Sequence, residues 1–326
     1  MIKNQWYAVA PTKIVKNKQV VALRRCGLDL ALFRTESGEL GCVVDKCSHR
    51  FAALSVGEVK GNCVMCPFHG LEFATDGTCS YVPASGKNFQ NHNERFNLQH
   101  YAVREAHGII YLFYGDASLA TDVLPYFDDL GDEWIYSEFV DRWETHYSRG
   151  IENQLDVIHL PFIHRKTIGR AFKTLVNGPK VIFVDNMIKT SANNSFDEGQ
   201  APKRAEDCEI NENMHLRFKF PNIWMNFISE KVRAVIYFAP VDDESTLFYI
   251  RFYTKLSKFA WVNRIIAFFG VFANRTIERE DKRVVVTQNP KPSQMKGGER
   301  LLPGDGPIFL YRKMRQELQD LAETQN

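Results

Sequence analysis

Cys47-Ser48-His49 and Cys66-Pro67-Phe68-His69, with sixteen residues between His49 and Cys66, decide the fold of the first third of the chain. Each stretch offers one thiol and one imidazole, so two short loops can hold one metal centre between them. Mixed pairs at a fixed separation are rare by chance among seven Cys and nine His in 326 residues. The pattern indicates a centre with thiolates on one side and imidazoles on the other.

The ligand types distinguish between two kinds of metal centre. A structural zinc site also accepts Cys and His, but its usual spacings are Cys-x2-Cys and His-x3-5-His. In a Rieske 2Fe-2S centre, two Cys hold one iron and two His hold the other. The mixed pairs therefore favour a Rieske 2Fe-2S cluster, with Cys47, His49, Cys66 and His69 as its predicted ligands.

Residues 47–73 resemble the cluster loops of the Rieske non-haem iron oxygenases. The shared positions outside the ligands are Arg50, Leu54-Ser55, Gly57 and Gly70. The chain departs from the family pattern at Ser48, Phe51 and Leu71, where Pro, Gly and Trp are common. The resemblance implies an electron-transfer domain in the N-terminal part of a larger redox protein.

Short apolar runs such as 20–23, 30–33 and 109–113 are separated by Gly, Asn and Asp turns in the first part of the chain. This pattern predicts an all-β Rieske domain over residues 1–115, with the cluster at the tips of two hairpins. The predicted domain is large enough to fold by itself, so the residues after it need another function.

Residues 116–326 are predicted to form a second domain, which makes the chain α+β overall. After a turn-rich linker, an antiparallel sheet is predicted from 181–189, 214–220, 223–228, 233–240 and 246–254. Helical sequence follows to the C-terminus. The polar stretch 191–213 is predicted to be a surface loop or lid.

A second metal site is suggested by Asn153, Asp156, His159 and His164. The first three recur every three residues, which would align them on one face of a helix. On an unbroken helix the two His would point apart, but Pro161 lies between them and can turn both imidazoles toward one ion. The alternative is two ordinary packed histidines, because this spacing alone is a weak signal.

Two His ligands require a carboxylate if the site is a facial triad, the arrangement that leaves coordination positions of non-haem Fe(II) open. Glu278, Glu280 and Asp281 are the candidates in the C-terminal third. Spacing does not choose among them, and any acid in so charged a helix could instead lie on a solvated, salt-bridging face.

The run from Asn153 to His164 resembles the Asn-x-x-Asp-x-x-His-x4-His signature of the same oxygenase family. That resemblance selects Asp281, which lies in a Glu-Asp-x-x-Val-Val context, and implies a mononuclear Fe(II) held by His159, His164 and Asp281. It further implies that Asp156 and Asn153 serve catalysis. Asp156 would bridge His159 of one subunit to His69 of the next in a homotrimer with helix-grip catalytic domains.

The chain is thus identified as similar to single-subunit-type Rieske monooxygenases and demethylases. The resemblance implies that O2 and externally supplied electrons hydroxylate or oxidatively demethylate a small organic substrate. A ferredoxin or flavin reductase is expected as donor, because the chain has no Gly-x-Gly-x-x-Gly fingerprint. A Rieske electron-transfer protein whose second domain is not catalytic remains the alternative.

Composition narrows the partners and the compartment. A net charge of +2 gives no reason to expect nucleic acid, and the N-terminus shows no signal-peptide pattern. Five irregularly spaced Cys remain beyond the cluster, as expected in a reducing, cytoplasmic setting. They are Cys26, Cys42, Cys63, Cys79 and Cys208.

The longest apolar stretch, 265–273, is far shorter than the roughly 20 residues that span a bilayer, so no membrane span is predicted. We expect a buried helix at a domain or subunit contact, with a membrane-facing patch as the alternative.

Overall fold

The computed structural model describes residues 1–86 and 93–324 of the chain. The chain forms two compact units. Unit 1 contains Met1, Lys3–Leu124 and Pro240–Asp242, and unit 2 contains Ile2, Pro125–Ala239 and Asp243–Asn326.

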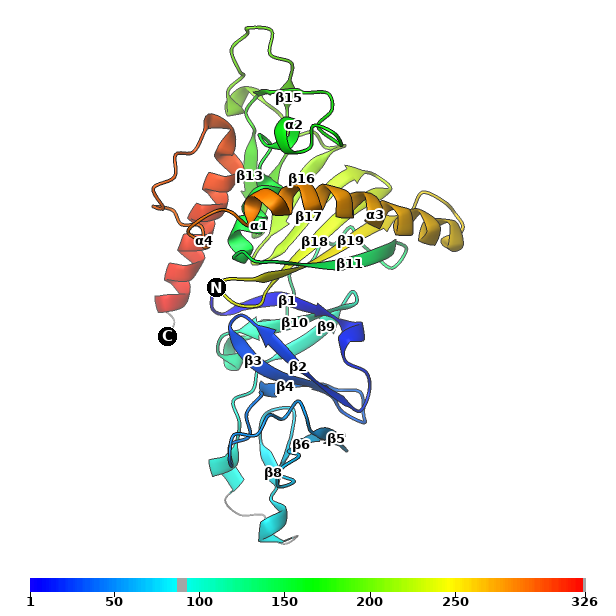
Figure 1. The fold of residues 1–326 in the computed structure, drawn as a ribbon, viewed down its shortest axis with the longest axis vertical. Coiled ribbons are helices and arrows are strands. Elements are labelled where there is room, and N and C mark those ends of the chain that lie inside the picture. The colour runs from blue at the N-terminus through cyan, green and yellow to red at the C-terminus, as the bar shows by residue number, and fades with distance from the viewer. Residues whose placement is uncertain (87–92, 325–326) are drawn as a thin grey trace. The chain divides into compact units, whose positions relative to one another are not determined.

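Unit 1 is built from short antiparallel strands in three sheets, ordered β1-β10-β9, β2-β3-β4 and β5-β6-β7-β8 (Figure 1). Its strands are β1 (Gln5–Pro11), β2 (Gln19–Arg25), β3 (Leu28–Arg34), β4 (Leu40–Val44), β5 (Glu58–Lys60), β6 (Cys63–Met65), β7 (Glu72–Phe73), β8 (Cys79–Tyr81), β9 (Val103–Ala106) and β10 (Ile109–Tyr114). Its 3-10 turns are η1 (Thr12–Ile14), η2 (Pro83–Ser85), η3 (Asn93–Phe96) and η4 (Ala117–Leu119). The all-β prediction for the N-terminal part is confirmed.

Two tight turns of unit 1 explain why the chain reverses where it does. Cys26-Gly27 joins β2 to β3 and His107-Gly108 joins β9 to β10, and all four residues have positive φ. Positive φ at both central residues is the requirement of the hairpin turn that matches the twist of antiparallel strands. The buried core beneath the cluster loops includes Phe33, Val43, Val64 and Phe73.

Unit 2 has a seven-stranded sheet ordered β11-β19-β18-β17-β16-β14-β13. Its strands are β11 (Ile135–Trp143), β13 (Val181–Val184), β14 (Met187–Thr190), β16 (His215–Lys219), β17 (Ile223–Ser229), β18 (Val232–Pro240) and β19 (Thr246–Thr254). The short strands β12 (Leu175–Val176) and β15 (Asn194–Ser195) pair separately, and η5 (Ala205–Asp207) and η6 (Pro303–Asp305) are 3-10 turns. The predicted α+β class with a large antiparallel sheet is confirmed.

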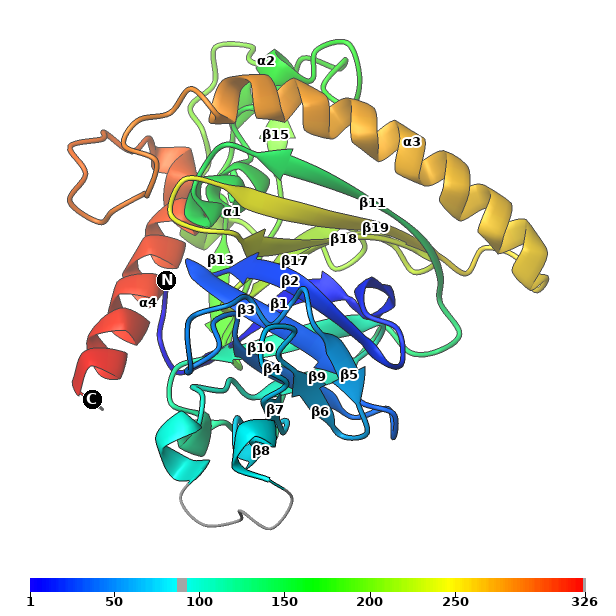
Figure 2. The ribbon, with the colours of Figure 1, turned by 60° about the horizontal axis from the view of Figure 1, so that its bottom comes forward.

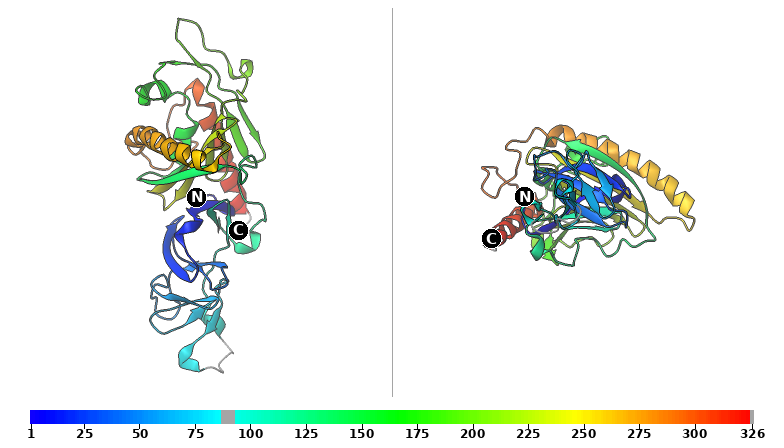
Figure 3. Two further views of the ribbon diagram at one scale, coloured as in Figure 1. Left: turned by 90° about the vertical axis from the view of Figure 1, so that its right-hand side faces the viewer. Right: turned by 90° about the horizontal axis from the view of Figure 1, so that it is seen from below.

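Helices of unit 2 cover one face of this sheet. They are α1 (Tyr147–Leu155), α2 (Leu160–Ile163), α3 (Ala260–Val285) and α4 (Gly306–Thr324). Small residues allow close packing, since a Cβ at Gly150 would strike Phe248 and one at Gly270 would strike Phe252. Tyr311 of α4 packs on the Phe218 ring of β16. The left panel of Figure 3 views α3 close to its axis and shows it to one side of the sheet.

Three details differ from the sequence-based expectations. Residues 181–189 are a hairpin rather than one strand, because Asp185 and Asn186 take the left-handed conformation that these residue types tolerate. Strand β11 was not predicted, since polar and apolar residues are mixed on both of its faces. The stretch 191–213 is largely exposed, but it contains β15 and η5.

The apolar stretch 265–273 lies within α3 and is buried on one side only. Ala267 and Val271 face the sheet, whereas Phe268, Phe269 and Phe272 are at least half exposed. Within this one chain only one stripe of α3 packs on the sheet, so burial of the other side at a subunit contact stays a prediction. In the described part of the chain, no helix is long and apolar enough to cross a membrane.

Candidate metal centres

The two predicted cluster loops have the same backbone design. Cys47 follows β4 and Cys66 follows β6, and each Cys donates its N–H to the carbonyl five residues ahead. Each Cys carbonyl also accepts from the N–H four residues ahead, which belongs to Phe51 or Gly70. Residues Phe51 and Gly70 have φ of 62° and 73°. The repeated pattern makes each ligand pair a rigid turn of matching shape.

Phe51 holds a left-handed conformation that costs a bulky residue free energy and that Gly70 adopts without strain. Its ring is 68% exposed, and the Lys46 ammonium lies 4.0 Å from the ring centroid. This departure from the common Gly therefore leaves the loop backbone unchanged and adds an apolar surface beside the cluster ligands.

Burial separates the two ligand types of the loops. Cys47 and Cys66 are each 1% exposed, whereas His49 and His69 are exposed with ring centroids 4.5 Å apart. Burial raises the pKa of the Cys47 thiol, and the neighbouring Cys66 thiol adds to the rise. Two buried thiols on one side and two imidazoles on the other fit a 2Fe-2S cluster whose irons have different ligands, because bound iron favours the thiolate form.

The segment that carries the other predicted ligands is not one continuous helix. Helix α1 ends at Leu155, and Asp156 caps its end with extended backbone, so Asn153, Asp156 and His159 do not lie along one helical face. Asp156 Oδ1 accepts from the backbone N–H of Ile158 at 2.6 Å, which turns the chain into α2. Pro161 lies at the start of α2, where a missing N–H costs nothing, and does not itself break α1.

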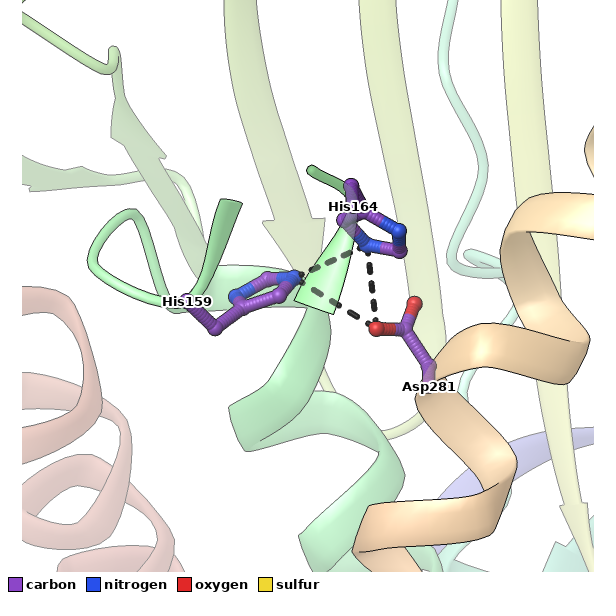
Figure 4. Close-up of side chains that lie close together, drawn as sticks. All are labelled: His159, His164 and Asp281. Carbon is purple, nitrogen blue, oxygen red and sulfur yellow. Dashed lines mark hydrogen bonds and ion pairs between the residues drawn. The ribbon is translucent and has the colours of Figure 1, made fainter. Parts of the chain in front are cut away.

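The chain break brings His159 and His164 together with Asp281 of α3 (Figure 4). The Nε2 atoms of the two histidines are 3.2 Å apart. Asp281 Oδ1 lies 3.5 Å from His159 Nε2 and 3.0 Å from His164 Nε2. Asp281 is 2% exposed and His164 is 1% exposed. The three predicted iron ligands are thus brought into one compact triangle.

The triangle fits a divalent cation. Asp281 Oδ1 is buried without a hydrogen-bond donor among the described residues, a costly state for a carboxylate oxygen. Neighbouring ligand atoms of an octahedral ion with bonds of about 2.1 Å lie about 3 Å apart, close to the edges of this triangle. Two imidazoles and one carboxylate are the donor set of non-haem Fe(II) sites with open positions.

Glu280 contacts Nδ1 of His164, the ring nitrogen that does not face Asp281. Its Oε2 lies 2.8 Å from His164 Nδ1 and accepts from the Thr167 hydroxyl at 2.7 Å. A carboxylate on Nδ1 keeps the proton there, which leaves Nε2 free to bind a metal. Burial alone would lower the pKa of His164, but the nearby carboxylates of Asp281 and then Glu280 outweigh the effect of burial and raise that pKa. Glu280 is therefore placed to orient a ligand.

Glu278, the third candidate acid, is buried at 5% exposure rather than solvated. Its Oε2 has no hydrogen-bond partner in the described chain. Burial first, and then the charges of Asp281 and Asp141, raise the pKa of Glu278 well above its ordinary value. The Glu278 carboxyl therefore keeps its proton to a higher pH than an ordinary glutamate does.

The residues predicted for catalysis lie beside the triangle. Asp156 Oδ2 is 3.5 Å from His159 Nδ1, so its carboxylate borders the ring nitrogen that faces away from the other two ligands. Asn153 Nδ2 is buried and has no acceptor among the described residues. Gln154 Nε2 lies 3.5 Å from Asp281 Oδ2, a contact that sequence reasoning missed because no pattern distinguishes this glutamine.

Comparison with known families identifies both parts of the chain. Residues 5–102 match the Rieske [2Fe-2S] domain, and residues 143–321 match the vanillate O-demethylase oxygenase C-terminal domain. The second match alone covers more than half of the chain. The chain therefore belongs to the Rieske oxygenase family, which confirms the resemblance seen in the cluster loops and in the segment from Asn153 to His164.

Individual relatives agree with this assignment. The 4beta-methylsterol monooxygenase of Methylococcus capsulatus is 34% identical over 168 residues, 51% of this chain and 45% of that protein. The vanillate O-demethylase oxygenase subunit of a Pseudomonas species is 29% identical over 197 residues, 57% of this chain and 54% of that protein. The matched segments span about half the length of these relatives.

A solved structure supports the fold over nearly the whole chain. NdmA of Pseudomonas putida CBB5 superposes with a TM-score of 0.80 at 21% identity, covering 98% of this chain and 92% of that one.

The acids of α3 should differ sharply in their effect on iron. Asp281→Ala should lower bound iron from about three toward about two per chain, because one ligand of the mononuclear site is lost while the cluster is kept. Glu280→Ala should keep iron at saturation but weaken its affinity by about 10–100-fold, because it orients His164. Iron titration of chelator-treated protein checks both, with the exposed Glu317→Ala as control. An empty site in Glu280→Ala and a full one in Asp281→Ala would move the ligand assignment by one residue.

Glu278 should make the stability of unit 2 depend on pH. The raised pKa means that the folded protein keeps a proton that the unfolded chain releases, so stability is lost as pH rises above the ordinary Glu pKa. Glu278→Gln removes that titration, and its advantage in unfolding free energy over the unsubstituted protein should grow from pH 4.5 upward. Urea unfolding of metal-free protein at several pH values measures this difference. Curves that stay parallel would show that Glu278 is ionised in the folded protein.

Proposed function

We propose that this protein is the oxygenase component of a Rieske system, which uses O2 and externally supplied electrons to hydroxylate or oxidatively demethylate a small organic substrate. Family membership supports an oxygenase, and vanillate O-demethylase and 4beta-methylsterol monooxygenase supply the two reaction types among relatives. In this proposal residues 1–115 form the Rieske domain and residues 116–326 the catalytic domain.

One observation carries the proposal. Two imidazole Nε2 atoms and a buried carboxylate oxygen converge in unit 2, and that oxygen has no hydrogen-bond donor among the described residues. An electron carrier needs the cluster loops alone, and a second domain without catalysis has no use for this costly arrangement. His159, His164 and Asp281 are therefore proposed as the ligands of a mononuclear Fe(II).

When bound, the iron would supply open coordination positions for O2 next to substrate, and the cluster would supply electrons. The chain's own residues prepare the site. Glu280 holds the proton of His164 on Nδ1, and Gln154 reaches the outer oxygen of Asp281. Burial of Asp281 and His164 excludes water from the ligand side.

Electron delivery is proposed to cross between subunits of a homotrimer. Asp156 Oδ2 lies near His159 Nδ1, and His69 is exposed at the tip of its loop, so Asp156 could accept hydrogen bonds from both rings in an assembly. Asn153, with a buried amide that lacks an acceptor, is proposed to position this route. A ferredoxin or flavin reductase is the proposed donor.

A reducing, cytoplasmic compartment is proposed for the protein. None of the seven cysteines, all of which the structure describes, forms a disulfide. Structural disulfides are rare where thiols are kept reduced.

Iron content separates the proposal from the alternative of a carrier with a non-catalytic second domain. The protein reconstituted with iron and sulfide should hold about three irons per chain, two in the cluster and one beyond it. His159→Ala should hold about two, keep the cluster absorbance and lose substrate oxidation. Two irons in the unsubstituted protein after saturation with Fe(II) would support the carrier.

Two inactive variants should rescue one another if electrons cross between subunits. Cys47→Ser chains lose the cluster but keep His159, whereas His159→Ala chains keep the cluster. In mixed trimers some interfaces pair an intact cluster with an intact iron site, so co-expressed variants should recover part of the turnover that each lacks. Native mass spectrometry verifies the mixing. Mixed trimers without activity would place electron transfer within one chain.

A further inference from the structure

Helix α3 carries an apolar stripe on the side turned away from the sheet. Its inner side is packed, with Asn263, Ala267 and Val271 buried. Its outer side begins at the Phe259 cap, and the spacing of the following residues by three or four places them along one stripe. The exposed apolar side chains are Phe259 (64%), Trp261 (63%), Ile265 (49%), Phe268 (53%), Phe269 (66%) and Phe272 (50%).

The same outer side carries only positive charge. No Asp or Glu occurs from residue 256 to 277, and Lys258, Arg264 and Arg275 lie exposed beside the stripe. Arg279 and Arg283 follow Arg275 at intervals of four and extend the outer side toward the C-terminal end. Arg283 also acts electrostatically on Glu280, whose pKa it helps to lower.

All three acids of α3 are turned away from this side. Glu278 is buried, Glu280 binds His164, and Asp281 belongs to the metal triangle. The helix is therefore divided by charge, with carboxylates toward the interior of unit 2 and cations outside. In Figure 2 the N-terminal part of the α3 ribbon extends beyond the strands of unit 2.

We propose that the outer side of α3 docks the protein on the surface of an anionic lipid bilayer. Trp and Phe on one side of a helix, with Lys and Arg around them and no acids, are the features of helices that lie in the membrane interface. The aromatic half would enter the headgroup boundary, and the arginine half would rest on lipid phosphates.

Charge favours a bilayer over a second copy of this chain. If α3 met α3 of a second copy, the exposed cations of both helices would lie together and repel, whereas a contact of α3 with a different face in the proposed trimer is distinguished by the oligomer measurement below. An anionic surface instead compensates every cation of the stripe at once.

If the proposed function is correct, docking on a bilayer also indicates which class of substrate reaches the metal site. Asp281 belongs to the same helix, so a docked α3 holds the metal triangle near the lipid surface. The substrate class that this arrangement serves is a lipophilic compound dissolved in the bilayer.

Vesicle sedimentation of the full holoprotein tests the docking independently of turnover. The protein should sediment with vesicles of phosphatidylcholine containing about 30% phosphatidylglycerol, less so in high salt, and hardly with phosphatidylcholine alone. The double variant Trp261→Gln/Phe269→Gln should need at least about fivefold more lipid for half-binding. The double variant Arg264→Gln/Arg275→Gln should lose the preference for phosphatidylglycerol.

Matched substitutions on α4 provide the control. Phe309 is 50% exposed and Lys313 lies on the same helix, so Phe309→Gln/Lys313→Gln removes one exposed aromatic ring and one exposed cation elsewhere in unit 2 and should bind vesicles normally. Circular dichroism and cluster absorbance verify that all variants are folded. Absence of sedimentation by the unsubstituted protein, or equal losses for α3 and α4 variants, would overturn the proposal. Dissociation of oligomers by the α3 variants without any lipid binding would instead assign the stripe to subunit contact.

Discussion

Two imidazole nitrogens and one buried carboxylate oxygen, held within 3.5 Å of one another, are the constraint on which unit 2 depends. The Nε2 atoms of His159 and His164 lie 3.2 Å apart, and Asp281 Oδ1 has no hydrogen-bond donor in the described chain. A shared proton or a cation must offset this arrangement. The donor set and its dimensions fit a divalent metal ion.

That constraint explains two features of the backbone. The chain must stop being helical between Leu155 and Leu160, because an unbroken helix would point His159 and His164 apart. Asp156 makes the break by accepting the N–H of Ile158, and the same carboxylate borders the outer nitrogen of His159. A single side chain therefore links the shape of the backbone to the orientation of a ligand.

Helix α3 has its three acidic residues on the inner side, near the metal triangle, and exposed basic residues on the outer side. Facing inward, Asp281 supplies the third corner of the triangle, Glu280 orients His164, and Glu278 has a raised pKa because it is buried. The raised pKa favours the protonated form of Glu278, which reduces the repulsion between two carboxylates in the buried site. Facing outward, the helix carries cations and exposed apolar side chains, none of which belongs to the metal triangle.

The sequence by itself determined what depends on residue type and local spacing. The mixed Cys and His pairs indicated a Rieske cluster, because few centres use one thiol and one imidazole from each of two loops. Strand periodicity gave the all-β first part and most strands of the larger sheet. It failed at residues 185 and 186, where the chain adopts a tight turn that apolar periodicity does not reveal.

Only the tertiary structure decided which distant groups meet. Spacing left Glu278, Glu280 and Asp281 equivalent, and family resemblance alone chose Asp281; the fold places its oxygen beside both imidazoles and turns Glu280 to the far nitrogen of His164. The contact of Gln154 with Asp281 and the burial of Glu278 had no sequence signal. Each depends on how α1, α2 and α3 pack on one sheet, and contacts between segments more than a hundred residues apart are set by that packing rather than by local pattern.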